Sequence, residues 1–201
     1  MIWWLKSRNA GVAASATAVT ALLGIVLGRT VLPVPSLLGG SGDFFLSALV
    51  TVAPAVVWLH GTGRTALATE ATALRPVHRW DVALAAALSA AALAVTAVAH
   101  LLASDDIALT VGRNITFYLA IAMLLSTFVG QRIAAPLITA IPIVLAVAGW
   151  RGRFPQPWAV VLHPGESHRA LAATVALMAV ASAVSAYVGP DNGISRAVAR
   201  R

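Results

Sequence analysis

Cysteine is absent from this chain of 201 residues, and Asp and Glu together number only seven. The absence of cysteine excludes disulfides, thiolate nucleophiles and cysteine-ligated metals, and it leaves the redox compartment open. The seven acidic residues lie in loops, in the tail or on one polar stretch, outside the apolar segments. A proton or sodium relay through a membrane needs buried carboxylates, so a secondary transporter is disfavoured.

Motifs for nucleotide and metal chemistry are also missing. The chain has no GxxxxGK[ST] loop to cradle nucleotide phosphates and no HExxH zinc motif. No acid, base and nucleophile can be placed together at one depth of the membrane. The sequence therefore predicts no catalytic, cofactor-binding or metal-binding residues, and a chain that is not an enzyme.

Apolar residues dominate what is present. The chain is 59% hydrophobic and 10% charged, with a mean hydropathy of +0.86, which is typical of an integral membrane protein. Segments of about twenty apolar residues predict an all-α, polytopic single domain that leaves no room for a soluble catalytic domain. The six expected spans are residues 10–32, 44–60, 82–103, 111–130, 133–149 and 171–188.

Basic residues give the chain a net charge of +7. They lie mainly between or beyond the apolar segments, which indicates a role in topology and contact with anionic lipid headgroups rather than with nucleic acid. Nine Lys and Arg fall on one side of the expected bundle and five on the other. The positive-inside rule then predicts a protein of the cell membrane with both termini in the cytoplasm.

A polar stretch from His60 to Asp81 separates the second and third spans. Its first part is expected to break the preceding helix at Gly61 and Gly63. Residues 64–74 then predict a short helix, with Leu67, Ala71 and Leu74 on one side and Glu70 on another. Pro76 is expected to end it. This element is too short and too polar to cross a bilayer, so we expect a cytoplasmic helix on the membrane surface.

Glycines and prolines mark features inside the spans. Gly24 and Gly28 have the small-xxx-small spacing that lets helix backbones approach closely, although this spacing also arises by chance in a chain rich in Ala and Gly. Pro54 is expected to kink the second span, and Pro136 and Pro142 the fifth.

Two loops on the external side contain residues that suggest chemistry. Gly39–Gly42 matches the GxSG pattern of intramembrane serine proteases, but it lies in a loop where glycines usually form turns. The external loop 150–169 contains His163, Glu166 and His168, whose spacing fits no dedicated zinc motif. Its residues 159–162 could dip into the bilayer as a short re-entrant helix.

The whole layout resembles the membrane subunit of type-2 ABC exporters, especially the compact, Ala/Arg-rich permeases of actinobacteria. The matching features are the interfacial stretch 2–6, the stretch ATEATALRPVHRWD after the second span, Arg113-Asn114 opening the fourth span, the turn 130–132, and FPQPW before the sixth span. The short N-terminal stretch and the small external region depart from the family pattern.

The resemblance implies how such a chain would work. The helix after the second span would be a coupling helix, here residues 69–79, seated in a groove of a separate cytoplasmic ATPase that binds ATP and Mg. Leu67, Ala71 and Leu74 would dock, and Glu70, Arg75 and Arg79 would form a polar rim. A second membrane subunit, identical or different, would complete the pathway for a hydrophobic or amphipathic solute, and residues 157–164 would form an external re-entrant segment.

Two other functions are consistent with the sequence. One is a membrane scaffold or immunity protein that binds a peptide or a membrane partner through its Ala/Gly-rich faces. The other is an intramembrane enzyme that uses Ser41, or His163 with Glu166 and His168.

Overall fold

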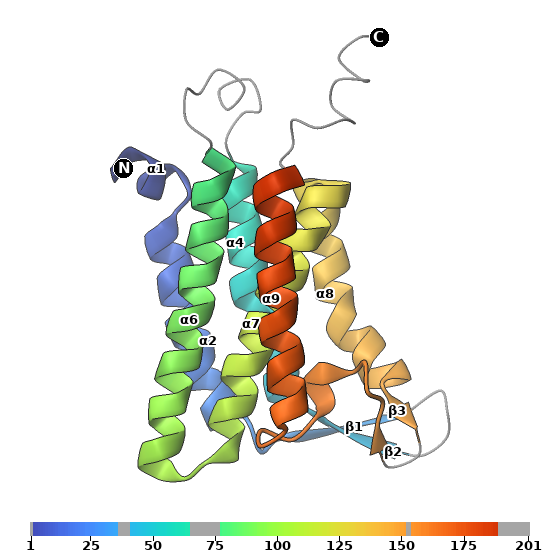
Figure 1. The fold of residues 1–201 in the computed structure, drawn as a ribbon. Helices are drawn as coiled ribbons and strands as arrows, with labels where there is room; N and C mark the ends of the chain where they lie inside the picture. The colour runs from blue at the N-terminus through green and yellow to red at the C-terminus, as the bar shows by residue number, and fades with distance from the viewer. Residues whose placement is uncertain (1, 36–40, 65–76, 152–153, 189–201) are drawn as a thin grey trace.

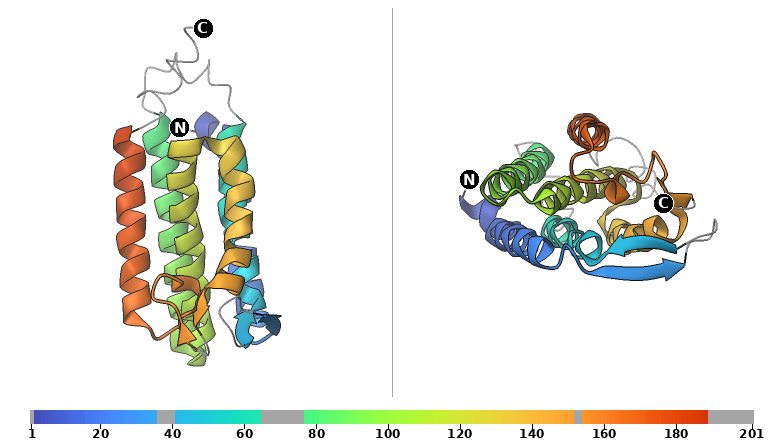
Figure 2. Two further views of the ribbon diagram at one scale, coloured as in Figure 1. Left: turned by 90° about the vertical axis from the view of Figure 1, so that its right-hand side faces the viewer. Right: turned by 90° about the horizontal axis from the view of Figure 1, so that it is seen from below.

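Helix α7 is the central element of a helical bundle (Figure 1). The computed structural model describes residues 2–35, 41–64, 77–151 and 154–188. Within α7, residues 111–120 are all buried. Five other helices of the bundle contact it, and the view from below in Figure 2 shows α7 lying among them. The bounds are α7 Asp106–Val129, α2 Ala10–Val26, α4 Ala53–Gly63, α6 Val77–Ala103, α8 Gln131–Ala148 and α9 His168–Val188.

Short elements cover the two ends of this bundle. At the end drawn uppermost in Figure 1, here named the N-terminal end, α1 (Ile2–Ser7) lies beside the start of α2. The opposite end, here named the hairpin end, contains two antiparallel strand pairs. These are β1 (Val31–Pro35) with β2 (Ser41–Phe45), and β3 (Trp150–Arg151) with β4 (Phe154–Pro155). The short helices α3 (Leu46–Val50) and η1 (Val160–Leu162) complete the described elements.

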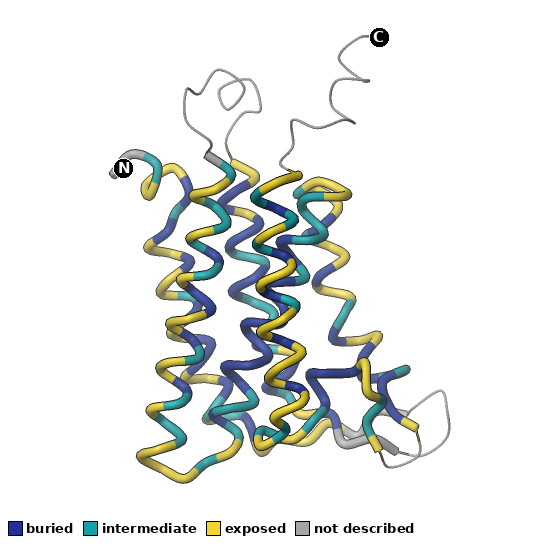
Figure 3. Tube along the Cα trace, viewed as in Figure 1, coloured by how far each residue is buried: buried dark blue, intermediate teal, exposed yellow. Residues whose placement is uncertain are grey.

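The chain is mainly helical, and five of its helical segments are long and apolar enough to cross a membrane. They are residues 46–63, 78–103, 106–129, 131–148 and 168–188. Helix α2 is also apolar but has 17 residues. Exposed residues follow the outer faces of the helices (Figure 3). Many of them are large and apolar, including Leu101 and Leu102 of α6. Such a surface is compatible with a membrane protein whose outer faces contact lipid.

Several predicted boundaries were wrong at the hairpin end. The first helix ends at Val26 instead of residue 32, because residues 31–35 pair with 41–45 as two strands where a loop was expected. Pro33 and Pro35 are compatible with this pairing because a two-stranded ribbon has only edge strands. The expected external loop 150–169 contains two short strands and a 3-10 helix, and α9 begins at His168.

The second span differs from its prediction at both ends. It consists of α3 followed by α4, and Pro54 lies in the first turn of α4, where a proline needs no N–H partner. The prediction that Gly61 and Gly63 break the helix was wrong, since α4 continues to Gly63. Gly61 lies inside α4, where the backbone of Arg8 packs so closely that a side chain at this position would collide with it.

Helix α6 begins at Val77, five residues before the predicted third span. His78, Arg79 and Asp81 therefore belong to the long helix and not to the polar stretch that precedes it. Helix α7 also begins five residues early, where the Asp105 side chain accepts a hydrogen bond from the Ile107 N–H at 3.1 Å. Arg113 and Asn114 thus lie about two turns inside α7 instead of one.

Helix α8 contains both prolines of the predicted fifth span. Pro136 is exposed, whereas Pro142 is buried. Each proline removes one backbone donor from the helix, a loss that packed helical bundles tolerate.

Candidate functional site

The predicted coupling residues fall mostly outside the described part of the chain. Leu67, Glu70, Ala71, Leu74 and Arg75 all lie in 65–76, outside the described residues. Arg79 lies in the first turn of α6 and is exposed. The structure describes the two helix ends that flank this segment, α4 up to Arg64 and α6 from Val77.

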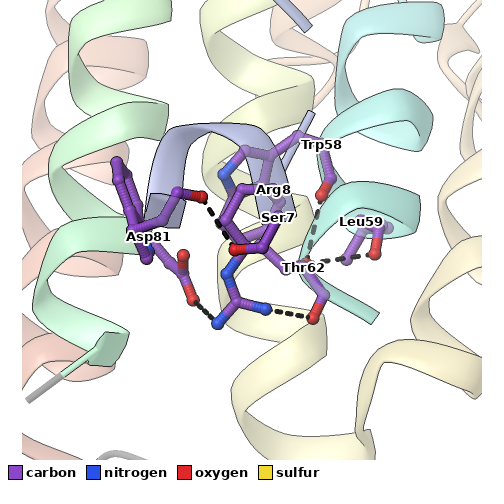
Figure 4. Close-up of polar contacts among 7 residues, drawn as sticks. Ser7, Arg8, Trp58, Leu59, Thr62 and Asp81 are labelled. Atoms are coloured by element: carbon purple, nitrogen blue, oxygen red, sulfur yellow. Dashed lines mark hydrogen bonds and ion pairs between the residues drawn. The ribbon is translucent and has the colours of Figure 1, made fainter. Parts of the chain in front are cut away.

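A buried arginine joins these two helix ends. Arg8, between α1 and α2, has a side chain that is 1% exposed, and its guanidinium forms an ion pair of 2.8 Å with the Asp81 carboxylate of α6. The same guanidinium donates a hydrogen bond of 2.7 Å to the Thr62 carbonyl of α4. Figure 4 shows Arg8 between these two partners. We call Arg8, Thr62 and Asp81 the arginine clamp.

Two further contacts support the arginine clamp. A Cβ atom at Gly61 would collide with the backbone carbonyl oxygen of Arg8, so α4 and the α1–α2 junction touch through backbone atoms. The rings of Trp4 and Trp80 lie 6.0 Å apart, which joins α1 to the start of α6. The α1–α2 junction, the end of α4 and the start of α6 therefore form one packed unit.

Gly24 and Gly28 lie where α2 packs against α7. A Cβ atom at Gly24 would come within 2.9 Å of both Val111 methyl groups, and one at Gly28 would collide with Ile107. Both glycines are buried. Their backbones are thus covered by α7 of the same chain, which leaves these two positions no outward face for a separate partner.

A second buried arginine anchors the external segment. Arg113 of α7 is 1% exposed, and its guanidinium donates hydrogen bonds to the carbonyls of Pro164 at 2.8 Å and of His163. A longer contact of 3.5 Å reaches the Val161 carbonyl. Residues 159–162 are buried, and η1 packs against α7 and α9. Arg113 thus holds the segment that follows η1 against the bundle.

Asn114 and Tyr118 are two buried polar side chains of α7 without hydrogen-bond partners among the described residues. Both are 0% exposed, and neither the Asn114 amide nor the Tyr118 hydroxyl has a hydrogen-bond partner among the described residues. They lie at the i and i+4 positions of α7 and continue the stripe of Ile107 and Val111 that packs on α2. Each such group costs about 1–3 kcal/mol if it stays unpaired.

The residues considered for hydrolytic or metal chemistry do not form a centre. Ser41 begins β2, while Gly39 and Gly40 lie outside the described residues. His163 is 3.1 Å from the Gln156 carbonyl through Nε2, and Glu166 and His168 are exposed. Within the described ranges, no three His, Asp or Glu side chains gather closely enough to hold a metal ion.

Sequence reasoning missed the arginine clamp. It counted Arg8 only as a topological charge and placed Asp81 at the end of a surface stretch. One signal was present, because Asp81 stands among basic residues at the start of an apolar helix, where an acidic side chain favours a cationic partner. The partner itself, 73 positions earlier by subtraction of the residue numbers, could not be identified from spacing.

Compared with protein-family models, with curated proteins and with solved structures, the chain matches none.

Proposed function

We propose that the chain is the membrane permease subunit of an ATP-driven exporter of the type-2 architecture. In this proposal α2 and the five longer helical segments form six spans, and the segment between α4 and α6 contains the coupling helix. A separate cytoplasmic subunit binds ATP and Mg, and a second membrane subunit completes the pathway. The solute is a hydrophobic or amphipathic small molecule, peptide or lipid-like compound.

The observation that carries this proposal is the arginine clamp. A coupling element transmits force only if both of its ends are attached to the helices that must move. Arg8 ties the end of α4 and the start of α6 to each other and to α2. A push on the segment between them would therefore displace several helices together, because the buried ion pair resists separation.

The distribution of charge supports a cytoplasmic position for this segment. Five described cations lie at the N-terminal end of the bundle, namely Lys6, Arg8, Arg64, Arg79 and Arg132. Asp81 is the one acidic residue described at that end, and it is paired with Arg8. The hairpin end contains as many acidic residues as cations, namely Asp43, Asp105, Asp106 and Glu166 beside Arg29, Arg113, Arg151 and Arg169. This asymmetry agrees with an N-terminal end that faces the cytoplasm of a cell whose plasma membrane holds the protein.

The test is co-purification with any Walker-motif protein that a neighbouring gene encodes. The complex is expected to hydrolyse ATP, and Glu70→Ala or Arg75→Ala is expected to lower turnover several-fold while the complex stays assembled. Arg169→Ala is the matched control, because Arg169 is an exposed cation in the first turn of α9 at the opposite end. If no ATPase is retained, or if Arg169→Ala is as damaging as Arg75→Ala, the proposal is wrong.

A further inference from the structure

A shallow, largely open groove lies on the surface at the N-terminal end of the bundle, where α1 meets α2. It has a volume of about 350 Å³ and is lined by Leu5 and Lys6 of α1, Asn9 of the junction, and Gly11 and Val12 of α2. No atom lies within 4 Å of the place that a Cβ atom of Gly11 would occupy. The space beside this glycine is thus open to a ligand.

The chemistry of the groove is divided between two sides. Lys6 is exposed and provides a positive charge, and Asn9 adds an amide side chain. Leu5 and Val12 are apolar and remain 43% and 55% exposed. A molecule that fits this division has an anionic, hydrogen-bonding head and an apolar body.

The apolar side of the groove continues along the outer face of α2. Val12, Val19, Leu23 and Val26 follow helical spacing and are all exposed. From Val12 to Val26 this stripe is about 21 Å long at 1.5 Å per residue. That length exceeds half of the roughly 30 Å hydrocarbon core of a bilayer, so the stripe is long enough to contact one acyl chain through a whole leaflet.

The surroundings favour an anion over a neutral head. Arg64, Arg79 and Arg132 are exposed at the same end as Lys6, and the described acidic residue of that end is paired with Arg8. The ring pair of Trp4 and Trp80 lies beside α1, and tryptophans concentrate at the headgroup level of membranes. The groove would therefore lie where lipid phosphates are found.

We propose that this groove binds one anionic phospholipid, with its phosphate beside Lys6 and Asn9 and one acyl chain along Val12, Val19, Leu23 and Val26. The proposal does not depend on transport or on an ATPase partner, because it concerns the lipid contact of this chain alone. A single lysine near an anionic headgroup contributes about 1 kcal/mol, which corresponds to roughly a fivefold change in affinity.

The test uses the full chain in detergent and native mass spectrometry with two lipids of identical chains, phosphatidylglycerol and phosphatidylcholine. Wild-type protein is expected to retain one phosphatidylglycerol in preference to phosphatidylcholine. Lys6→Ala should reduce this retention about fivefold. Gly11→Leu should abolish it, because its side chain fills open space in the groove without a clash inside the protein.

Arg132→Ala is the matched control, since it removes one exposed cation from the same end of the bundle outside the groove. It is expected to change retention less than twofold. Equal losses in Lys6→Ala and Arg132→Ala would mean general surface attraction and would overturn the site, as would equal retention of the two lipids. Wild-type retention by a folded Gly11→Leu variant, or displacement of the lipid by millimolar inorganic phosphate, would also overturn it.

Discussion

The guanidinium of Arg8 lies 2.8 Å from the carboxylate of Asp81, and the side chain of Arg8 is almost completely buried. These two residues join the α1–α2 junction to the start of α6. Burial of a charged guanidinium carries a large desolvation cost, which a carboxylate partner offsets. The contact between these elements therefore depends on the Arg8–Asp81 ion pair as well as on apolar packing.

Removal of one partner of this pair is expected to destabilise the protein more than removal of both. Asp81→Ala leaves a buried charge without its counter-ion and should lower the free energy of unfolding by about 3 kcal/mol. The double variant Arg8→Met/Asp81→Leu should lose less, since no charge remains buried. Thermal unfolding of all variants in one detergent measures this order, with Arg132→Ala as the exposed control. A double variant that unfolds first would contradict it.

The glycines of α2 and of the turn that follows it provide a graded test of the contact with α7. Gly28→Ala should be the most damaging, by about 1–3 kcal/mol, because its Cβ collides with Ile107. Gly24→Ala should cost less, since the Val111 methyl groups at 2.9 Å need only a small shift. Gly11→Ala meets no atom within 4 Å and should stabilise the protein by about 0.5–1 kcal/mol through a less flexible unfolded chain.

Thermal unfolding again measures this series, and Ile107→Ala should partly restore Gly28→Ala because it removes the colliding methyl group. Equal losses at Gly24 and Gly11 would show that helix propensity, and not the contact with α7, decides the effect.

The long helices could be predicted from the sequence because each is a continuous apolar run. The observed α8 and α9 begin within three residues of the predicted spans and end within one. The start of α6 could not be predicted in this way, because His78, Arg79 and Asp81 are polar and belong to a helix whose first turn projects beyond the apolar run. Pro76, which was expected to end the preceding helix, lies outside the described residues.

The buried polar residues were the harder part of the prediction. Arg113 and Asn114 were recognised in the sequence as polar residues inside a span. Their positions in the sequence do not show which neighbouring elements their side chains contact. Arg113 reaches the carbonyls of His163 and Pro164 after η1. Asn114 instead follows the helical spacing of Ile107 and Val111, whose side chains face Gly28 and Gly24. The partner of Arg8 depends on how distant helices meet, which local pattern does not specify.

Arg113 is expected to control the order of the segment that it anchors. Arg113→Ala leaves the carbonyls of His163 and Pro164 without this donor, so amide hydrogen exchange in residues 159–167 should become at least tenfold faster. Arg113→Lys should be intermediate, because an ammonium cannot reproduce the planar, multiple donation of a guanidinium. Arg169→Ala, an exposed change nearby in sequence, should leave exchange unaltered. Unchanged exchange in Arg113→Ala would show that burial of η1 alone holds the segment.

Asn114 and Tyr118 test whether the interior of the bundle is shaped for stability or for a solute. Both side chains are fully buried without partners among the described residues. Asn114→Leu and Tyr118→Phe remove polar atoms that cost free energy, so thermal unfolding should occur at the same or a higher temperature.

Thr116→Val is the matched control for these two variants, because the Thr116 hydroxyl donates a hydrogen bond of 2.9 Å to the Gly112 carbonyl. Loss of this hydrogen bond should lower the free energy of unfolding by about 1 kcal/mol.

If the interior contacts the transported solute, the two stabilised variants should also lose solute-stimulated ATP hydrolysis by the assembled complex, about tenfold or more. Higher thermal stability together with lower activity is the result expected for polar groups that are retained for function. Variants that unfold earlier than wild type would instead show that the amide and the hydroxyl have partners in the folded protein, such as internal water, and serve its structure.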